Sequence, residues 1–127
     1  MNKKYLIVSF MATHFSRLKQ HWRKTQHHRL FLPPFLGGKI AILDWNNKKI
    51  IWDIDIDIPT GVVYYDKLLF VNSLKNEILG INKLKKIKYK LINPKFNSLH
   101  SLIKTPRGFL VTSSGLDLIL EVDYFGN

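Results

Sequence analysis

Asn76-Glu-Ile-Leu-Gly-Ile-Asn82 and Asp117-Leu-Ile-Leu-Glu-Val-Asp123 are two versions of one short pattern in this 127-residue sequence. The second version begins 41 residues after the first. Internal repeats at such a period are typical of proteins that stack similar supersecondary units against one another. The repeat therefore predicts the architecture before any functional residue is considered.

The same offset extends to both sides of this pattern. It aligns the following positions: Thr60 with Ser101, Val62 with Ile103, Lys67 with Gly108, Leu69 with Leu110, Ser73 with Ser114, Ile78 with Ile119, Leu79 with Leu120, and Ile81 with Val122. A partial third copy precedes both, since Lys39–Asp44 resembles Glu77–Asn82 and Lys49–Trp52 resembles Lys86–Tyr89. We expect two full units and a leading half.

Turn residues divide each unit into about four short apolar stretches with the length of β-strands. Pro59-Thr60-Gly61, Asn93-Pro94 and Pro106-Arg107-Gly108 are the clearest of these breaks. Four strands in about forty residues is the size of a propeller blade. We predict an all-β fold of consecutive four-stranded antiparallel blades, in which each sheet needs neighbours to cover its two faces.

The stretch from His100-Ser-Leu-Ile through Pro106-Arg-Gly-Phe-Leu-Val to Asp117-Leu-Ile-Leu-Glu-Val-Asp123-Tyr-Phe-Gly126 resembles blades of NHL, gluconolactonase-like and YWTD-type β-propellers. The resemblance covers roughly residues 38–127 and implies blade architecture without implying an activity. It also implies that His100 lies near an inner strand, where ligands of these proteins meet the central channel.

About two and a half blades are fewer than the four or more of closed propellers. We expect an incomplete propeller, which makes the chain a fragment or a truncated gene product. Assembly with blades from other copies, and a fold that does not close, are the alternatives. Further blades are accordingly the expected partners.

Residues 1–37 differ in kind from residues 38–127, and we treat them as a separate lead-in. Tyr5–Phe10 predicts a strand, and residues 13–30 predict a basic helix with one narrow apolar stripe at Phe15, Leu18 and Trp22. The first residues weakly resemble a signal peptide but lack an A-x-A-type cleavage site, so we expect a cytoplasmic protein, with secretion as the alternative. No stretch reaches the ~20 apolar residues of a membrane span.

The net charge is +11, and all nine acids lie from Asp44 onward. A basic surface on the predicted helix consists of Arg17, Lys19, Arg23, Lys24 and Arg29. Such a surface suits nucleic acid or an anionic membrane. We favour the simpler interpretation that lysines in turns keep a strand-rich chain soluble and protect its sheet edges.

Few residues suggest a binding or catalytic role. The candidate ligand-binding residues are His100 and the turn residues Asn72, Ser73 and Ser114. Cysteine is absent, which excludes thiolate chemistry and disulfides. The sequence also lacks a Ser-His-Asp ordering or a G-x-S-x-G elbow, so no catalytic residue is predicted.

Three aspartates, Asp53, Asp55 and Asp57, follow the alternation of the stretch Ile50–Ile58 and share one strand face. They could bind calcium, but a regular strand lacks the glycine-containing loop of calcium sites. We predict that they pair with lysines of a neighbouring strand, with Lys86, Lys88 and Lys90 as the matching set. His14, His21, His27 and His28 show no metal-binding spacing, and we expect neither a metal nor a cofactor.

Three functions remain. The first is a non-catalytic binding or scaffold module, which we favour because the repeats bring no cluster of titratable residues. The second is a truncated gluconolactonase-like or arylsulfotransferase-like enzyme, whose site would draw on more blades. The third is a binder of nucleic acid or anionic surfaces through the basic helix, whose affinity should fall steeply with salt. We expect no catalytic activity from the isolated chain.

Overall fold

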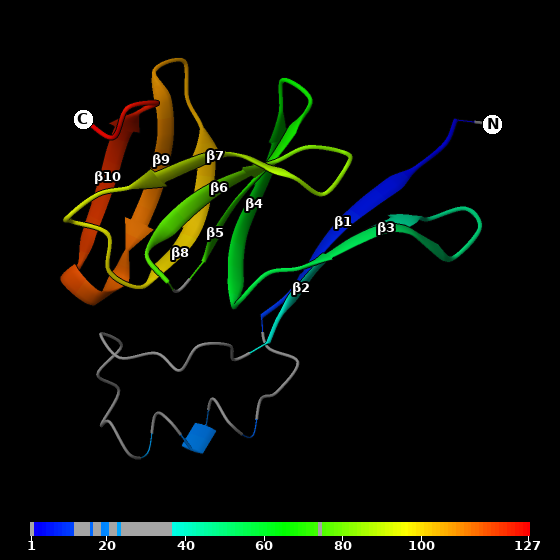
Figure 1. Cartoon of the computed structure of the whole chain (residues 1–127), viewed down its shortest axis with the longest axis horizontal. Coiled ribbons are helices and arrows are strands. Elements are labelled where there is room, and N and C mark those ends of the chain that lie inside the picture. Colours follow the sequence, from blue (N-terminus) through cyan, green and yellow to red (C-terminus); the bar gives the residue numbers. More distant parts are fainter. Residues whose placement is uncertain (1, 12–15, 17–18, 21–22, 24–36, 74) are drawn as a thin grey trace.

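The computed structural model describes residues 2–11, 16, 19–20, 23, 37–73 and 75–127. These residues form three antiparallel sheets, which confirms the all-β prediction (Figure 1). Sheet 1 has the order β1 (Tyr5–Phe10), β2 (Lys39–Asp44), β3 (Lys49–Asp55). Sheet 2 has the order β4 (Pro59–Tyr65), β5 (Leu68–Ser73), β6 (Glu77–Ile81), β7 (Ile87–Ile92). Sheet 3 has the order β8 (Leu99–Lys104), β9 (Gly108–Ser113), β10 (Leu118–Asp123).

The prediction of uniformly four-stranded units is wrong in detail. Within the described residues only sheet 2 has four strands, whereas sheets 1 and 3 have three. The three sheets do not close into a ring, as expected for so few units. The predicted strand Tyr5–Phe10 is confirmed as β1. The predicted helix over residues 13–30 falls almost entirely outside the described residues, so it stays a prediction.

Sheet 2 lies between the other two sheets because both of its faces are apolar. Along β5, Leu69 and Val71 point to one side and pack with Ile40 of sheet 1. Phe70, between them, points to the other side and packs with Phe109 of sheet 3. This period-two alternation is that of a strand buried on both faces, and it confirms that neighbouring sheets cover one another.

Pairing registers show that the sheets repeat one plan. Pro59 pairs with Ser73 in sheet 2 and Leu99 pairs with Ser113 in sheet 3, and a bulge follows each pair. These positions differ by 40 residues. From β6 to β10 the offset becomes 41, because the turn before β10 holds one residue more than the turn before β6.

The uniform offset of 41 is therefore right for β6 and β10 and wrong by one residue for the two strands before them. Ile78 and Ile119 do occupy the same, third strand of their sheets, as the repeat requires. The error has consequences because neighbouring residues of a strand face opposite ways. The true equivalent of Leu69 is Phe109 rather than Leu110, since they pair with Tyr64 and Lys104 respectively.

Sheet 1 follows the same plan, but its first strand corresponds to the second strand of sheet 2. Ile42 pairs with Trp52 and Gly80 pairs with Tyr89, and in both ladders a bulge follows at the next residue. The match of Lys49–Trp52 with Lys86–Tyr89 is thus confirmed by the register. On the other side of β2, Ile7 pairs with Ile42, as Phe70 pairs with Gly80, so β1 corresponds to β5.

The Asp or Asn that ends the repeated pattern has a clear structural role. In each sheet its side-chain oxygen accepts a hydrogen bond from the backbone amide two residues later, which closes the turn after the strand. The three bonds run to Oδ1 of Asp44 from Asn46 (3.0 Å), to Oδ1 of Asn82 from Leu84 (3.0 Å), and to Oδ1 of Asp123 from Phe125 (2.9 Å). Short polar side chains are therefore required at these three positions.

The predicted strand Ile50–Ile58 ends earlier, at Asp55. Beyond it the backbone leaves the ladder, and the amides of Ile56 and Ile58 donate instead to the carbonyls of Gly38 and Gly37. Ile58 has a positive φ of 45°. Asp57 consequently lies in the connection to sheet 2 rather than on the strand face of Asp53 and Asp55.

Candidate functional site

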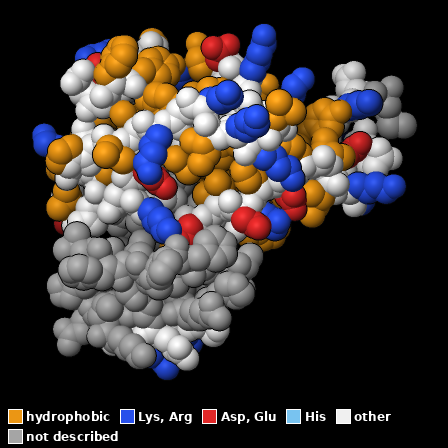
Figure 2. Space-filling view, viewed as in Figure 1, with side chains coloured by type: hydrophobic (Ala, Val, Ile, Leu, Met, Phe, Trp, Pro, Cys, Tyr) orange, Lys and Arg blue, Asp and Glu red, His pale blue; other side chains and the backbone are white. Residues whose placement is uncertain are grey.

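A groove of about 750 Å³ opens between sheet 1 and sheet 2. Most of its lining is apolar or aromatic, and within the described part of the chain two lysines are the charged residues that line it. The lining residues are Tyr5, Ile7, Ile42, Ile51, Trp52, Tyr64, Lys67, Leu69, Ile81, Asn82, Lys83 and Leu84. In the view of Figure 2, apolar side chains gather over the middle of the molecule, with Lys and Arg side chains around them. A groove of this size and lining suits a small ligand.

The corresponding space between sheets 2 and 3 is filled by four aromatic rings: Phe70, Tyr89, Phe109 and Tyr124. Ring centroids of Phe70 and Phe109 lie 4.9 Å apart, and those of Phe109 and Tyr124 lie 5.5 Å apart. Such tilted and edge-to-face contacts are the preferred packing of aromatic side chains. This cleft is closed by its own side chains.

Smaller residues stand at three of the four matching positions in the groove. Following the registers above, Ile7 corresponds to Phe70, Leu69 to Phe109, and Lys83, which follows Asn82, to Tyr124, which follows Asp123. Only Trp52, which matches Tyr89, keeps an aromatic ring. The groove exists because three rings are missing from an otherwise repeated arrangement.

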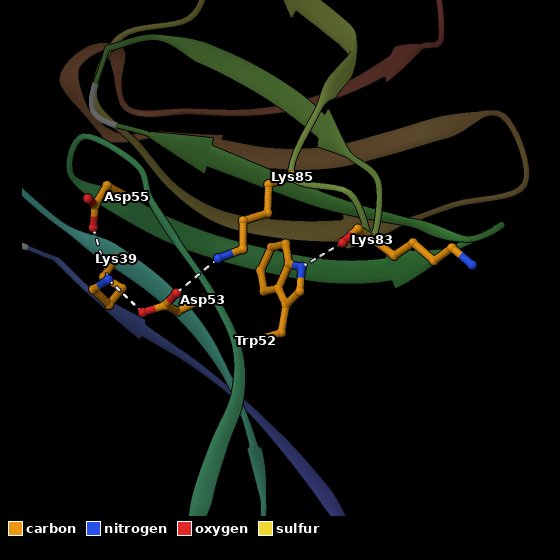
Figure 3. A network of polar contacts seen from close by, with 6 residues as sticks. All are labelled: Lys39, Trp52, Asp53, Asp55, Lys83 and Lys85. Carbon is orange, nitrogen blue, oxygen red and sulfur yellow. Dashed lines mark hydrogen bonds and ion pairs between the residues drawn. The ribbon is translucent and has the colours of Figure 1, made fainter.

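Trp52 is fixed in the groove by a hydrogen bond that also repeats. Its indole Nε1–H donates to the backbone carbonyl of Lys83 over 2.9 Å (Figure 3). In the filled cleft the hydroxyl of Tyr89 donates to the matching carbonyl of Tyr124 over 2.7 Å. Each bond joins the last strand of one sheet, β3 or β7, to a turn of the next sheet, after β6 or β10. The Trp52 ring is therefore held between the two walls of the groove.

Burial raises the pKa of the Tyr89 hydroxyl to about 12, and the neighbouring Tyr124 and Asp123 add to this effect. The phenol is therefore neutral, and it remains a hydrogen-bond donor, over the physiological range.

An ion-pair network ties the two walls together at one edge of the groove (Figure 3). Lys39 contacts Asp53 at 2.8 Å and Asp55 at 3.0 Å, all three within sheet 1. Lys85, from the turn between β6 and β7, reaches Asp53 at 3.2 Å. Hydrogen bonds from Lys39 and then Lys85 lower the pKa of Asp53, and hydrogen bonds to Asp53 and Asp55 raise the pKa of Lys39. Sheet 2 is thereby linked to sheet 1 through one carboxylate.

The prediction that the aspartates pair with lysines is confirmed, but the predicted lysines are wrong. Asp53 and Asp55 meet Lys39 on the adjacent strand, and Asp57 meets Lys75 at 2.8 Å. Of the predicted set, Lys90 pairs with Glu77 at 2.7 Å. The register explains this difference. Asp53 and Lys90 occupy matching positions, as do Lys39 and Glu77, so sheet 1 carries the same pair with its charges exchanged.

Within the described part of the chain, no three His, Asp or Glu side chains gather as metal ligands do.

The sequence-predicted ligand residues lie away from the groove and have structural contacts. Asn72 is fully buried, and its Oδ1 accepts a hydrogen bond from Gly61 N at the β4 bulge while its Nδ2 donates to Ser101 O over 2.9 Å. Thr112 occupies the matching place in sheet 3, where its Oγ1 accepts from Ser101 N. Asn72 thus stabilises a bulge and joins sheet 2 to sheet 3.

Ser73 and Ser114 have comparable roles in turns. The hydroxyl of Ser73 accepts from Lys75 N over 3.1 Å, and the hydroxyl of Ser114 donates to Ser98 O over 2.9 Å. His100 is exposed on β8, the first strand of sheet 3. The structure does not bring these four residues together with the groove, and a ligand role for them stays a prediction.

The structure describes two residues of the predicted basic surface. Lys19 and Arg23 are exposed, whereas Arg17, Lys24 and Arg29 fall outside the described residues, as do the four histidines His14, His21, His27 and His28.

No known family model matches the chain, and no curated protein matches it in sequence. The propeller resemblance therefore rests on the residues alone. Among the described residues, no helix has the length and apolar character that crossing a bilayer requires.

Sequence reasoning missed the groove, although two signals were present. Trp52 is the aromatic residue that matches Tyr89 in the partial repeat, and Tyr5 and Tyr64 lie in strands that were predicted. A position-by-position comparison of the repeats would have shown that smaller side chains replace aromatic ones at three of the four matching positions. It needed the correct offset of 40 residues, because the offset of 41 matches Leu69 with Leu110 and hides the loss of a ring.

Proposed function

We propose that this protein is a non-catalytic binding module, built from blade-like sheets of an incomplete β-propeller, that holds a small apolar ligand between sheets 1 and 2. The observation that carries the proposal is the contrast between the two clefts. One is packed with its own aromatic side chains, whereas the other is an open groove with an apolar lining and a fixed tryptophan. A ligand ring in the groove takes the place of the missing side chains.

The walls of this groove support binding rather than collapse. Trp52 is held by Lys83, and Asp53 is held by Lys39 and Lys85, so the two sheets are bridged at the groove edge. Pre-formed walls lower the ordering cost that a ligand must offset on binding. The alternative of a truncated enzyme rests on the propeller resemblance alone, and the alternative of a nucleic-acid binder rests on residues that are mostly undescribed.

The neutral dye N-phenyl-1-naphthylamine tests the proposal, since its fluorescence rises in apolar surroundings. The protein should bind it saturably with one site per chain. The variant Ile7→Phe/Leu69→Phe restores two rings of the filled cleft and should weaken binding by roughly tenfold or more, a loss of about 1.4 kcal/mol for each tenfold. Circular dichroism checks that the variant is folded.

The variant Ile119→Ser is the matched control. It removes an apolar side chain from the exposed face of sheet 3, far from the groove in the repeat, and should leave dye binding unchanged. Absence of saturable binding to the unaltered protein, or loss of binding in Ile119→Ser with retention in the ring-filled variant, contradicts the proposal.

A further inference from the structure

The charged residues that line the groove restrict the class of ligand that it can bind. Among the described residues, the charged side chains that line the groove are Lys67 and Lys83, and none of these lining residues is an acid. In the described structure neither ammonium group forms an ion pair with another described residue. Asp53, a carboxylate of the ion-pair network, is already engaged by Lys39 and Lys85.

Both lysines lie at the same end of the groove. Leu69 pairs with Ile81, so the turn before β5 and the turn after β6 meet at one end of sheet 2. Lys67 stands two residues before Leu69, and Lys83 stands two residues after Ile81. Two cations are thus gathered beside an apolar lining rather than spread around it.

Aromatic faces make up much of the remaining lining. Tyr5 and Tyr64 line the groove together with Trp52, and both tyrosines are exposed. The Nζ of Lys85 lies 6.0 Å from the centre of the Trp52 ring, at the outer reach of a cation–π contact. Flat aromatic bodies stack well on such side chains in tilted or offset arrangements.

We infer that the groove selects an aromatic anion, with its flat apolar body against Trp52 and a single carboxylate, sulfonate or phosphate between Lys67 and Lys83. This inference rests on the proposed function, since it names the ligand class of the same groove. The apolar body supplies most of the affinity, and the anionic group supplies selectivity and orientation. Lysine, as a compact point charge, suits such a group without demanding one geometry.

Two dyes that differ in one group test the inference. 1-Anilinonaphthalene-8-sulfonate has the ring system of N-phenyl-1-naphthylamine plus a sulfonate. The protein should bind the sulfonate more tightly than the neutral dye. This advantage should shrink as salt rises from 10 mM to 500 mM, because added ions screen exposed charges.

The variant Lys67→Gln/Lys83→Gln should weaken binding of the sulfonate by roughly 2- to 20-fold, as expected for two exposed ion pairs, and should leave the neutral dye unaffected. The control variant Lys88→Gln/Lys95→Gln loses the same net charge at exposed positions outside the groove lining. It should bind both dyes as the unaltered protein does.

The outcomes separate the two proposals. If the neutral dye binds but the sulfonate binds no better, or if the control variant loses as much sulfonate affinity as the groove variant, the anion inference is wrong and the binding function stands. If neither dye binds saturably, the proposed function itself fails. Parallel loss of both dyes in Lys67→Gln/Lys83→Gln also overturns the anion inference.

Discussion

The two clefts that flank sheet 2 share one backbone plan and differ in what fills them. On one side Phe70, Phe109 and Tyr124 pack with Tyr89, and of the four matching positions on the other side only that of Trp52 is aromatic. The hydrogen bond from Trp52 to Lys83 matches that from Tyr89 to Tyr124. A repeated architecture can therefore be kept by its ladders, turns and one cross-sheet bond, while a few side-chain sizes decide whether a cleft is a core or a groove.

The largest expected effect comes from emptying the filled cleft. Phe109→Ala should lower the free energy of unfolding by about 3–5 kcal/mol, since a fully buried ring leaves a cavity. The matching variant Leu69→Ala should cost less, near ~2 kcal/mol, because its side chain already borders the groove. Urea denaturation measures both. Equal costs at the two positions would mean that the clefts do not differ as described.

The next comparison concerns the repeated isoleucine. Ile78 is 0% exposed beneath sheet 3, and its equivalent Ile119 is 72% exposed on the free face of that sheet. Ile78→Ala should cost about 2–5 kcal/mol, and Ile119→Ala should stay within ~0.5 kcal/mol. A large loss on substituting Ile119, measured for a protein shown to be monomeric, would contradict its assignment to an uncovered position.

The cross-sheet bond of Tyr89 is expected to contribute less. Tyr89→Phe keeps the ring and removes the donor to Tyr124, so unfolding should become easier by about 1 kcal/mol at pH 7.

The same variant reports the raised pKa of Tyr89. The unfolded phenol ionises near its ordinary pKa of 10.0, whereas the folded phenol ionises only at about 12. The unfolded state therefore loses the proton first, and Tyr89 lowers stability as pH rises between these values. Between pH 10 and 12 stability should fall more steeply in the unaltered protein than in Tyr89→Phe. Parallel pH profiles would show that Tyr89 is not the responsible group.

The smallest effect should come from the exchanged charge pair. Lys39→Glu places a third acid beside Asp53 and Asp55 and should lower the melting temperature slightly. Adding Asp53→Lys recreates the Glu77–Lys90 arrangement of sheet 2 and should restore part of the loss. If the double variant loses more stability than Lys39→Glu and Asp53→Lys lose together as single variants, the two ladders are not equivalent at this position.

Much of the fold could be predicted from the sequence because the pattern is local. Ile78 and Ile119 stand in the same strand of their sheets, and the Asp or Asn after them closes a turn, as short polar side chains do. The offset of 41 failed for β8 and β9, because the turn before β10 holds one residue more than the turn before β6. A shift of one residue reverses the two faces of a strand.

The candidate groove could not be predicted in the same way. Its walls come from Tyr5, Trp52 and Leu69, which are far apart in the sequence, and its depth depends on side chains that are smaller than their counterparts. The aspartates illustrate the same limit. Their pairing with lysines could be predicted from the alternation of side chains along the strand. Which lysines they pair with, Lys39 and Lys85, depends on the strand order and on how sheet 2 packs against sheet 1.

The most direct test of the groove is a methyl NMR titration of isoleucine-labelled protein with N-phenyl-1-naphthylamine. The dye should shift the methyl signals of Ile7, Ile42 and Ile81, which line the groove, and leave those of Ile78 and Ile119 in place. Shifts centred on Ile119, or spread evenly over all isoleucines, would show that the space between sheets 1 and 2 is not a binding site.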